Sequence, residues 1–168
     1  LVDHAVGDLT ITAEAGKKFS DVQTLLGQSE QFLAIDPHYP DQATLGGIIS
    51  TADTGALRHR YHSVRDMILG ISFVRSDGRV VKNVAGYDLM KLLTGAYGTL
   101  GIITQVTLRV YPLPQASQTI VLSGRPENIA QAAQTLLNSA LTPSAIAAAV
   151  AQSRGNPLFA LQLLHAWA

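Results

Sequence analysis

Residues 43–55 read Ala-Thr-Leu-Gly-Gly-Ile-Ile-Ser-Thr-Ala-Asp-Thr-Gly and combine glycines and small hydroxyl residues with a single charge. We name them the first glycine-rich segment. Glycine allows a backbone with positive φ and lets a ligand approach the main chain closely. Successive N–H groups in such a turn form a concave site for an anion, which a following helix N-terminus strengthens. The segment therefore suits the phosphates of a nucleotide, with a purely structural glycine-rich turn as the alternative.

A second glycine-rich segment, residues 95–101, reads Gly-Ala-Tyr-Gly-Thr-Leu-Gly. It follows an expected helix at 88–93 and opens an expected strand at 102–110. That order is the reverse of the dinucleotide-binding βαβ motif. Each segment alone is a weak signal. Together they predict that one segment holds phosphates while the other holds a base or ribose through backbone groups.

The composition excludes several classes of protein. The chain has 168 residues, 47% of them hydrophobic, which is enough for one domain or one domain and part of another. Twelve basic and twelve acidic residues leave no net charge, unlike a nucleic-acid-binding protein. Cysteine is absent, so this chain supplies no disulfide, thiolate nucleophile or thiolate metal ligand. No apolar run approaches the ~20 residues of a membrane-spanning helix, and no signal peptide opens the chain.

The pattern of apolar residues predicts alternating strands and helices. Strands are expected at 9–15, 32–35, 67–74 and 102–110. Helices are expected at 21–26 with Ser20 as N-cap, at 48–52 and at 88–93. Residues 76–79 are a hairpin turn signal before a return strand at 80–81. After a linker at 112–115 we expect a strand at 118–122 and a helix at 125–137. An alanine-rich stretch at 143–151 and an apolar stretch at 157–164 then follow. Their pattern leaves open whether they form strands or helices.

Three stretches together resemble one family of flavoproteins. They are residues 40–47 with the later Gly55, residues 64–71, and residues 82–89 running into 98–104. Their order and spacing are similar to those of the FAD-binding domain of the vanillyl-alcohol oxidase and p-cresol methylhydroxylase (PCMH) type, the FAD-linked oxidases. The Lys-Asn-Val-Ala-Gly-Tyr-Asp variant at 82–88 more specifically resembles the FAD-binding subunits of glycolate oxidase (glycolate dehydrogenase). The resemblance covers residues 1–112, and residues 113–168 are compatible with that family's cap domain.

The resemblance implies an α+β fold. Residues 1–112 are expected to form the second α/β subdomain of a PCMH-type FAD-binding domain, with a mixed or antiparallel sheet flanked by helices. Residues 113–168 are expected to form part of a cap or substrate domain. The family's domain begins with a smaller βα subdomain that would precede Leu1, and it has a longer glycine-bearing segment where residues 79–82 stand here. We therefore expect a fragment whose FAD site lacks contacts on one face of the cofactor.

The resemblance also implies which residues hold FAD. Residues 37–47 would wrap the pyrophosphate, with the backbone amides of residues 43–47 as donors, and residues 51–55 would continue towards the flavin. Residues 95–101, with the two isoleucines that follow, would hold the adenosine end. Asp66 would anchor a loop. The expected cofactor-binding residues are Pro37, His38, Pro40, Asp41, Gln42, Ala43, Thr44, Leu45, Gly46, Gly47, Thr51, Ala52, Asp53, Thr54, Gly55, Gly95, Gly98, Thr99, Leu100, Gly101, Ile102 and Ile103.

The catalytic base cannot be assigned from the sequence. His38, His59, His62 and His165 are candidates by residue type alone, and a single histidine is more often structural. His59 and His62 rank first because they lie in the polar stretch 53–66, directly after the first glycine-rich segment. Its arginines, Arg58, Arg60 and Arg65, would pair a substrate carboxylate or an FAD phosphate, or else form a solvated charged loop. We expect no metal site, because Asp53, His59 and His62 have no recognisable ligand spacing.

Three functions follow from these expectations. The first is the FAD-binding subunit of a complex that oxidises a 2-hydroxy acid, with glycolate converted to glyoxylate and with a larger flavin subunit and an iron–sulfur subunit as partners. The second is another FAD-linked oxidase, such as a D-lactate dehydrogenase. The third is an assembly subunit that keeps the fold without a working flavin site. The expected location is the cytoplasm, with attachment to the inner face of the membrane through partners as an alternative.

Overall fold

The computed structural model describes residues 2–83, 88–125, 127–129, 131–132, 135 and 158–165. Of Asn83 and of residues 116–123 and 158–165 it describes the backbone alone. The chain divides into two compact units, Leu1–Leu113 and Pro114–Ala168. The assignment of these units to an FAD-binding domain and a cap domain stays a prediction.

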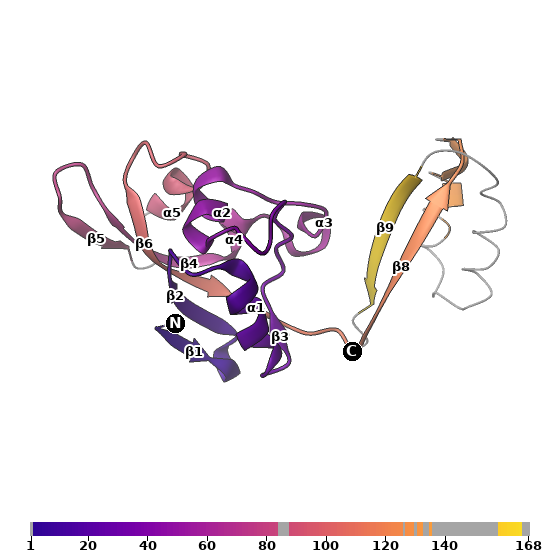
Figure 1. The fold of residues 1–168 in the computed structure, drawn as a ribbon, viewed down its shortest axis with the longest axis horizontal. Helices are drawn as coiled ribbons and strands as arrows, with labels where there is room; N and C mark the ends of the chain where they lie inside the picture. The colour runs from indigo at the N-terminus through magenta and orange to yellow at the C-terminus, as the bar shows by residue number, and fades with distance from the viewer. Residues whose placement is uncertain are drawn as a thin grey trace. The chain divides into compact units, whose positions relative to one another are not determined.

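The first unit is built on a five-stranded antiparallel sheet with the order β1-β2-β6-β4-β5 (Figure 1). Its strands are β1 Asp3–Ala5, β2 Thr10–Glu14, β4 Ile68–Val74, β5 Val80–Asn83 and β6 Ile102–Arg109. One face of the sheet carries the buried side chains of Ile11, Ala13, Ile71, Val106 and Leu108. The other face is polar, and Thr12 and Thr107 join their hydroxyl groups across it at 2.9 Å. Such a division into an apolar and a polar face is typical of antiparallel sheets.

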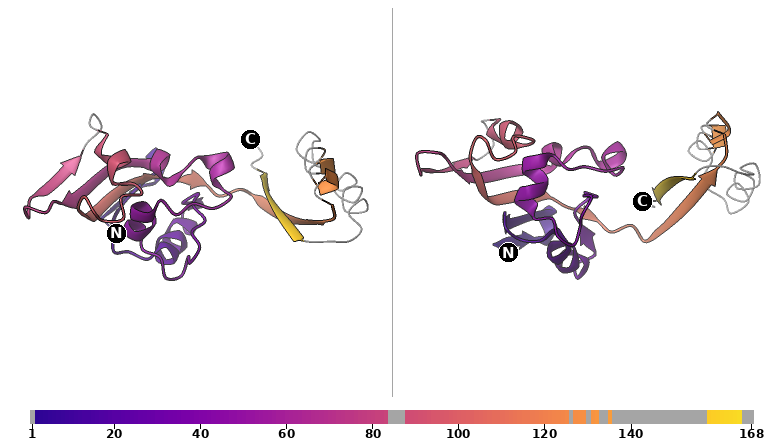
Figure 2. Two further views of the ribbon diagram at one scale, coloured as in Figure 1. Left: turned by 90° about the horizontal axis from the view of Figure 1, so that it is seen from above. Right: turned by 45° about the horizontal axis from the view of Figure 1, so that its top comes forward.

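The first unit also contains six short helices within its described residues. They are η1 Val6–Asp8, α1 Phe19–Gly27, α2 Leu45–Thr51, α3 Arg58–Tyr61, α4 Val64–Met67 and α5 Leu89–Leu93. α2 lies between α1 and α5, and α3 lies at the outer end of the loop that leaves α2 (Figures 1 and 2). α2 buries Leu45, Ile48 and Ile49 completely, which anchors the first glycine-rich segment in the core. Among the described residues, none of the helices has the length and apolar character that crossing a membrane requires.

A two-stranded ribbon closes the first unit. It pairs β3 Gln31–Phe32 with β7 Tyr111–Pro112. Phe32 and Tyr111 pack around the buried ring of Tyr61, with ring centroids 5.6 and 4.8 Å from it. Because Tyr61 is the last residue of α3, this aromatic cluster anchors the middle of the polar stretch 53–66.

The second unit contains one described strand pair. β8 Ala116–Ser123 pairs in antiparallel register with β9 Leu158–His165. The strand expected at 118–122 is confirmed, and the apolar stretch at 157–164, whose type the sequence left open, is a strand. Of the helix expected at 125–137, the described residues 127–129, 131–132 and 135 are helical. The alanine-rich stretch at 143–151 lies outside the described residues.

Most expected elements of the first unit are confirmed, and four details are wrong. Ser20 lies inside α1, which begins at Phe19 after Lys18. The strand expected at 32–35 is confined to β3, although residues 33–35 are buried. The stretch 53–66 contains α3 and α4 where a loop was expected. α2 begins at Leu45 and not at residue 48, because the Thr44 Oγ1 accepts the N–H of Gly47 at 3.1 Å and caps the helix before the glycines.

Candidate cofactor site

A cleft of about 290 Å³ lies where the two glycine-rich segments meet. Its lining residues have small, hydroxyl or aliphatic side chains, and none is ionisable. They are Ala15, Gly16, Thr44, Gly46, Gly47, Ser50, Gly98, Gly101, Ile102 and Ile103. The walls are therefore backbone, hydroxyl groups and methyl groups, and no fixed negative charge opposes an anion.

The second glycine-rich segment is bonded directly to the end of α2. The N–H of Gly95 donates to the carbonyl oxygen of Ile49 at 3.0 Å, and the N–H of Tyr97 donates to that of Ser50 at 2.8 Å. These bonds satisfy carbonyl groups that a helix C-terminus leaves without an intrahelical partner. They also bring together two parts of the chain that are far apart in sequence.

A tight turn presents Gly98 to the cleft. Tyr97 and Gly98 both have positive φ, 53° and 73°, and the N–H of Thr99 donates to the carbonyl oxygen of Ala96 at 3.0 Å. Two consecutive central residues with positive φ define a type I′ turn, which favours glycine. Gly98 therefore serves the turn, and a Cβ on it would meet no atom within 4 Å.

Two other glycines of the cleft are required by close packing. A Cβ on Gly46 would lie 2.9 Å from the Cβ of Ala15. A Cβ on Gly101 would lie 2.7 Å from the carbonyl oxygen of Val74 and 2.8 Å from Cδ2 of Phe73. Real Cβ atoms do not approach other atoms this closely, so these glycines let α2 and the start of β6 pack against the sheet.

The expectation that residues 43–47 offer free amides is wrong for four of the five. Three N–H groups donate to carbonyl oxygens at 2.8 to 3.0 Å: Ala43 to Tyr39, Leu45 to Lys17 and Gly46 to Ala15. The fourth, that of Gly47, donates to Oγ1 of Thr44 at 3.1 Å. For Leu45 and Gly46 the reason is that this part of the chain forms an antiparallel bridge at Lys18 and Thr44 with the residues that follow β2, where an open loop was expected. The polar side chains that line the cleft are the hydroxyl groups of Thr44 and Ser50.

The structure places seven of the expected cofactor-binding residues on the cleft. They are Thr44, Gly46, Gly47, Gly98, Gly101, Ile102 and Ile103. The remaining expected residues, at 37, 38, 40–43, 45, 51–55, 95, 99 and 100, are not part of its lining. Sequence reasoning missed Ala15, Gly16 and Ser50. Gly16 directly follows an expected strand. A glycine at the end of a strand was the one sequence signal that could have indicated Gly16 as a site residue.

The stretch after α2 carries the charged candidates. Arg58, His59, His62 and Arg65 are all exposed, and none of them lines the cleft. Asp66 anchors this stretch as expected, because its Oδ2 accepts the hydroxyl group of Ser63 at 2.7 Å and the N–H of Ser63 at 3.1 Å. Hydrogen bonds from the hydroxyl group and then the N–H of Ser63 lower the pKa of Asp66 below its ordinary value.

Neither of the other two histidine candidates is part of the cleft lining. His38 is exposed and contacts Asp53, and His165 lies in β9 of the second unit. The described residues contain no group of three or more His, Cys, Asp or Glu side chains placed to hold a metal ion.

The fold and the cleft suit a nucleotide-binding domain, and a comparison with known families identifies its class. Residues 1–83 match the family described as FAD binding domain. The first half of the chain therefore belongs to the FAD-binding domains of FAD-linked oxidases, and the cofactor of this family is FAD. This confirms the family resemblance.

Several curated relatives fall in the same family. The chain is 37% identical to the glycolate oxidase subunit GlcE of Escherichia coli (strain K12) over 71% of its length and 37% of that protein. It is 33% identical to the glycolate oxidase subunit GlcD of Bacillus subtilis (strain 168), over 77% of the chain and 28% of that protein. It is 35% identical to the mitochondrial D-lactate dehydrogenase (cytochrome) of Arabidopsis thaliana, over 69% of the chain and 21% of that protein. The chain thus spans well under half of each relative.

A solved structure shows the same fold. Alkyldihydroxyacetonephosphate synthase, in crystal form P1, superposes with a TM-score of 0.69 at 26% sequence identity. The superposition covers 78% of this chain and 25% of the synthase chain. The expected PCMH-type α+β fold is confirmed.

Proposed function

We propose that this chain is the FAD-binding part of an oxidoreductase that oxidises a 2-hydroxy acid, with glycolate as the first candidate substrate. The observation that carries the proposal is the cleft that the two glycine-rich segments form together. Its volume of about 290 Å³ is close to the lower end of ligand pockets, ~300–1,000 Å³. It therefore suits one part of FAD, such as a phosphate with its ribose.

The residues of the cleft fit that part of the cofactor. The side formed by α2 offers the hydroxyl groups of Thr44 and Ser50, which suit phosphate oxygens. The side formed by the start of β6 offers Ile102, whose side chain is 70% exposed, as an apolar surface for a base. No carboxylate lines the cleft, so a pyrophosphate meets no repulsion there.

FAD, when bound, supplies the hydride acceptor for the carbon that carries the substrate's hydroxyl group. The residues of this chain bind and orient the cofactor, and none of those lining the cleft is a general base. The base that takes the hydroxyl proton therefore comes from outside the cleft. His59 and His62 remain the first-ranked candidates within the first unit, ahead of His38.

The names of the relatives support the substrate class and the setting. Glycolate and D-lactate are both 2-hydroxy acids, and the glycolate oxidase relatives are named as subunits. We propose that the chain works beside a larger flavin subunit and an iron–sulfur subunit, in the cytoplasm or held at the inner face of the membrane by those partners. A D-lactate dehydrogenase and a flavin-free assembly subunit are the competing functions.

An FAD titration of the full chain tests the cleft. Gly47→Asp places a carboxylate beside the proposed phosphate position, and we expect it to weaken FAD binding at least tenfold, which corresponds to about 1.4 kcal/mol. Gly7→Asp is the matched control, because a Cβ on Gly7 meets nothing within 4 Å and η1 lies outside the cleft. Equal FAD affinity of the two variants would contradict the assignment. A wild-type chain without FAD affinity would favour the assembly subunit.

The substrate is tested on the FAD-loaded protein. Glycolate added without oxygen is expected to bleach the flavin absorbance faster than D-lactate does at equal concentration. Faster bleaching by D-lactate would favour the dehydrogenase alternative.

A further inference from the structure

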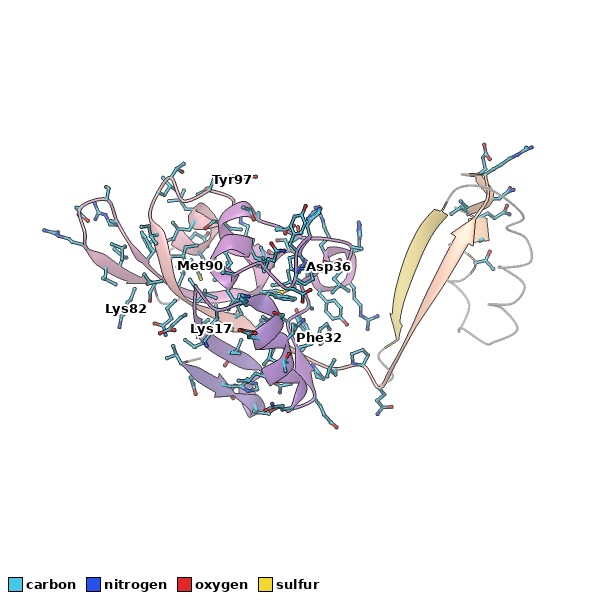
Figure 3. All side chains as sticks on the ribbon, in the orientation of Figure 1. Lys17, Phe32, Asp36, Lys82, Met90 and Tyr97 are labelled. Carbon is cyan, nitrogen blue, oxygen red and sulfur yellow. The ribbon has the colours of Figure 1, made fainter. Side chains whose placement is uncertain are left out.

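The carboxylate of Asp36 accepts hydrogen bonds from the loop that follows α2. Its Oδ1 accepts the N–H of Gly55 at 3.0 Å, and its Oδ2 accepts the N–H of Leu57 at 3.1 Å. Asp36 is half-buried and lies beside the loop that leads to α3 (Figure 3). Hydrogen bonds to an ionised acceptor are stronger than those between neutral groups, so this carboxylate holds the loop firmly.

Gly55 packs directly against Asp36. A Cβ on Gly55 would lie 2.5 Å from Cγ of Asp36 and 2.7 Å from its carbonyl oxygen. Any side chain at position 55 would therefore displace the carboxylate or the backbone of Asp36. Glycine at this position allows the two segments to lie in contact.

A second carboxylate, on the loop after α2, accepts hydrogen bonds from the segment that contains Asp36. The Oδ2 of Asp53 accepts the N–H of His38 at 3.0 Å, and its Oδ1 lies 2.6 Å from Nδ1 of His38. The bonds between Asp53 and His38 are exposed, whereas those from Gly55 and Leu57 to Asp36 are partly buried. Because solvent competes less with the Asp36 bonds, Asp36 is the stronger of the two ties.

The loop has little other support where Asp36 holds it. α2 ends at Thr51 and is followed by Ala52, whose φ is 54°, and the N–H of Asp53 closes the helix on the carbonyl oxygen of Ile48. The N–H groups of Gly55 and Leu57 donate to neither a helix nor a sheet, because Asp36 supplies both acceptors.

We propose that Asp36 is the positioning residue of the segment Thr51–Gly55, and that Gly55 acts through Asp36 and not by contact with the cofactor. The inference rests on the proposed function, because residues 51–55 are the segment expected to run along FAD towards the flavin. Asp36 was not among the predicted site residues, yet its carboxylate would set the conformation of this part of the site.

Three variants of the full chain test the role of Asp36. Asp36→Ala removes both acceptors, Asp36→Asn keeps one acceptor oxygen, and Asp8→Asn is the control that removes an exposed carboxylate from η1. Amide hydrogen exchange at Gly55 and Leu57 is the first measurement. We expect Asp36→Ala to raise the exchange rate of both amides at least tenfold, Asp36→Asn to leave one of them slow, and Asp8→Asn to change neither.

FAD affinity and the circular dichroism of the bound flavin are the second measurement. Asp36→Ala is expected to weaken FAD binding about tenfold and to change the flavin spectrum, with partial rescue by Asp36→Asn. Unchanged exchange at Gly55 and Leu57, or faster exchange with unchanged FAD affinity, would overturn the inference. If the wild-type chain binds no FAD, the proposed function fails, and the exchange rates alone decide whether Asp36 positions the loop.

Discussion

At the scale of single residues, similar glycines have different physical roles. Gly46 and Gly101 are required by close packing, Gly98 by a turn with positive φ, and Gly55 by the carboxylate of Asp36. Gly47 meets only the hydroxyl oxygen of Thr44, at 3.1 Å from a Cβ. A glycine-rich sequence therefore marks a place where backbones approach each other, and a ligand is only one of the reasons for such an approach.

His62 is the residue with the most strained backbone conformation in this region. Its φ of 68° and ψ of −170° belong to a region that glycine alone occupies readily. The buried ring of Tyr61 on one side and the Ser63–Asp66 contact on the other hold it there.

We predict that His62→Gly stabilises the protein. Relief of strain of 1–3 kcal/mol exceeds the entropic cost of glycine, so the free energy of unfolding should rise by about 1 kcal/mol. His62→Ala keeps a Cβ and should bring no such gain. Urea unfolding of both variants measures the difference, and a glycine variant no more stable than the alanine variant would show that the conformation is not strained.

At the scale of elements, α2 is the helix on which the candidate site depends. Its buried face anchors it to the core, its first turn lines the cleft, and its last carbonyl groups bind the second glycine-rich segment. The cleft therefore requires both the position of α2 and the close approach of the chain at Gly101 to β4.

A substitution at Gly101 tests this close approach. Gly101→Ala forces its Cβ against the carbonyl oxygen of Val74 and the ring of Phe73, so the start of β6 must move. We expect a loss of about 2 kcal/mol in the free energy of unfolding, in the range of overpacked sites. Gly7→Ala, which meets nothing within 4 Å, should change it by no more than about 0.5 kcal/mol. Urea unfolding would refute the prediction if the two variants were equally stable.

At the scale of the whole molecule, the first unit contains its own hydrophobic core. β7 returns the chain to β3, and the N–H of Leu113 donates to the carbonyl oxygen of Glu30 at 2.7 Å. The aromatic cluster of Phe32, Tyr61 and Tyr111 is thereby complete within residues 1–113.

We predict that a chain ending at Leu113 folds cooperatively by itself. A chain ending at Arg109 lacks the fully buried Val110, β7 and the half-buried ring of Tyr111, and it should be less stable by about 3 kcal/mol, in the range of large truncations in cores. Thermal unfolding followed by circular dichroism compares the two. Absence of a cooperative transition in the longer one would mean that residues 114–168 contribute to the fold of the first unit.

The long elements and the class of the domain could be predicted from the sequence alone. β4, β6, α5 and the hairpin turn at 76–79 are visible because local periodicity and turn chemistry encode them. The two glycine-rich segments and the motif at 82–88 were enough to identify the family and its cofactor. The short strands β1 and β7 escaped detection and β3 was expected too long, because pairing partners distant in sequence stabilise these strands and their own propensity is weak.

The tertiary structure alone decided how the glycines are used. Whether an amide at residues 43–47 is free depends on the chain after β2, which the sequence does not place beside it. The bonds from Gly95 and Tyr97 to the end of α2, and the bonds from Gly55 and Leu57 to Asp36, likewise join distant segments. Such contacts arise from the packing of the whole core, so local sequence patterns do not predict them.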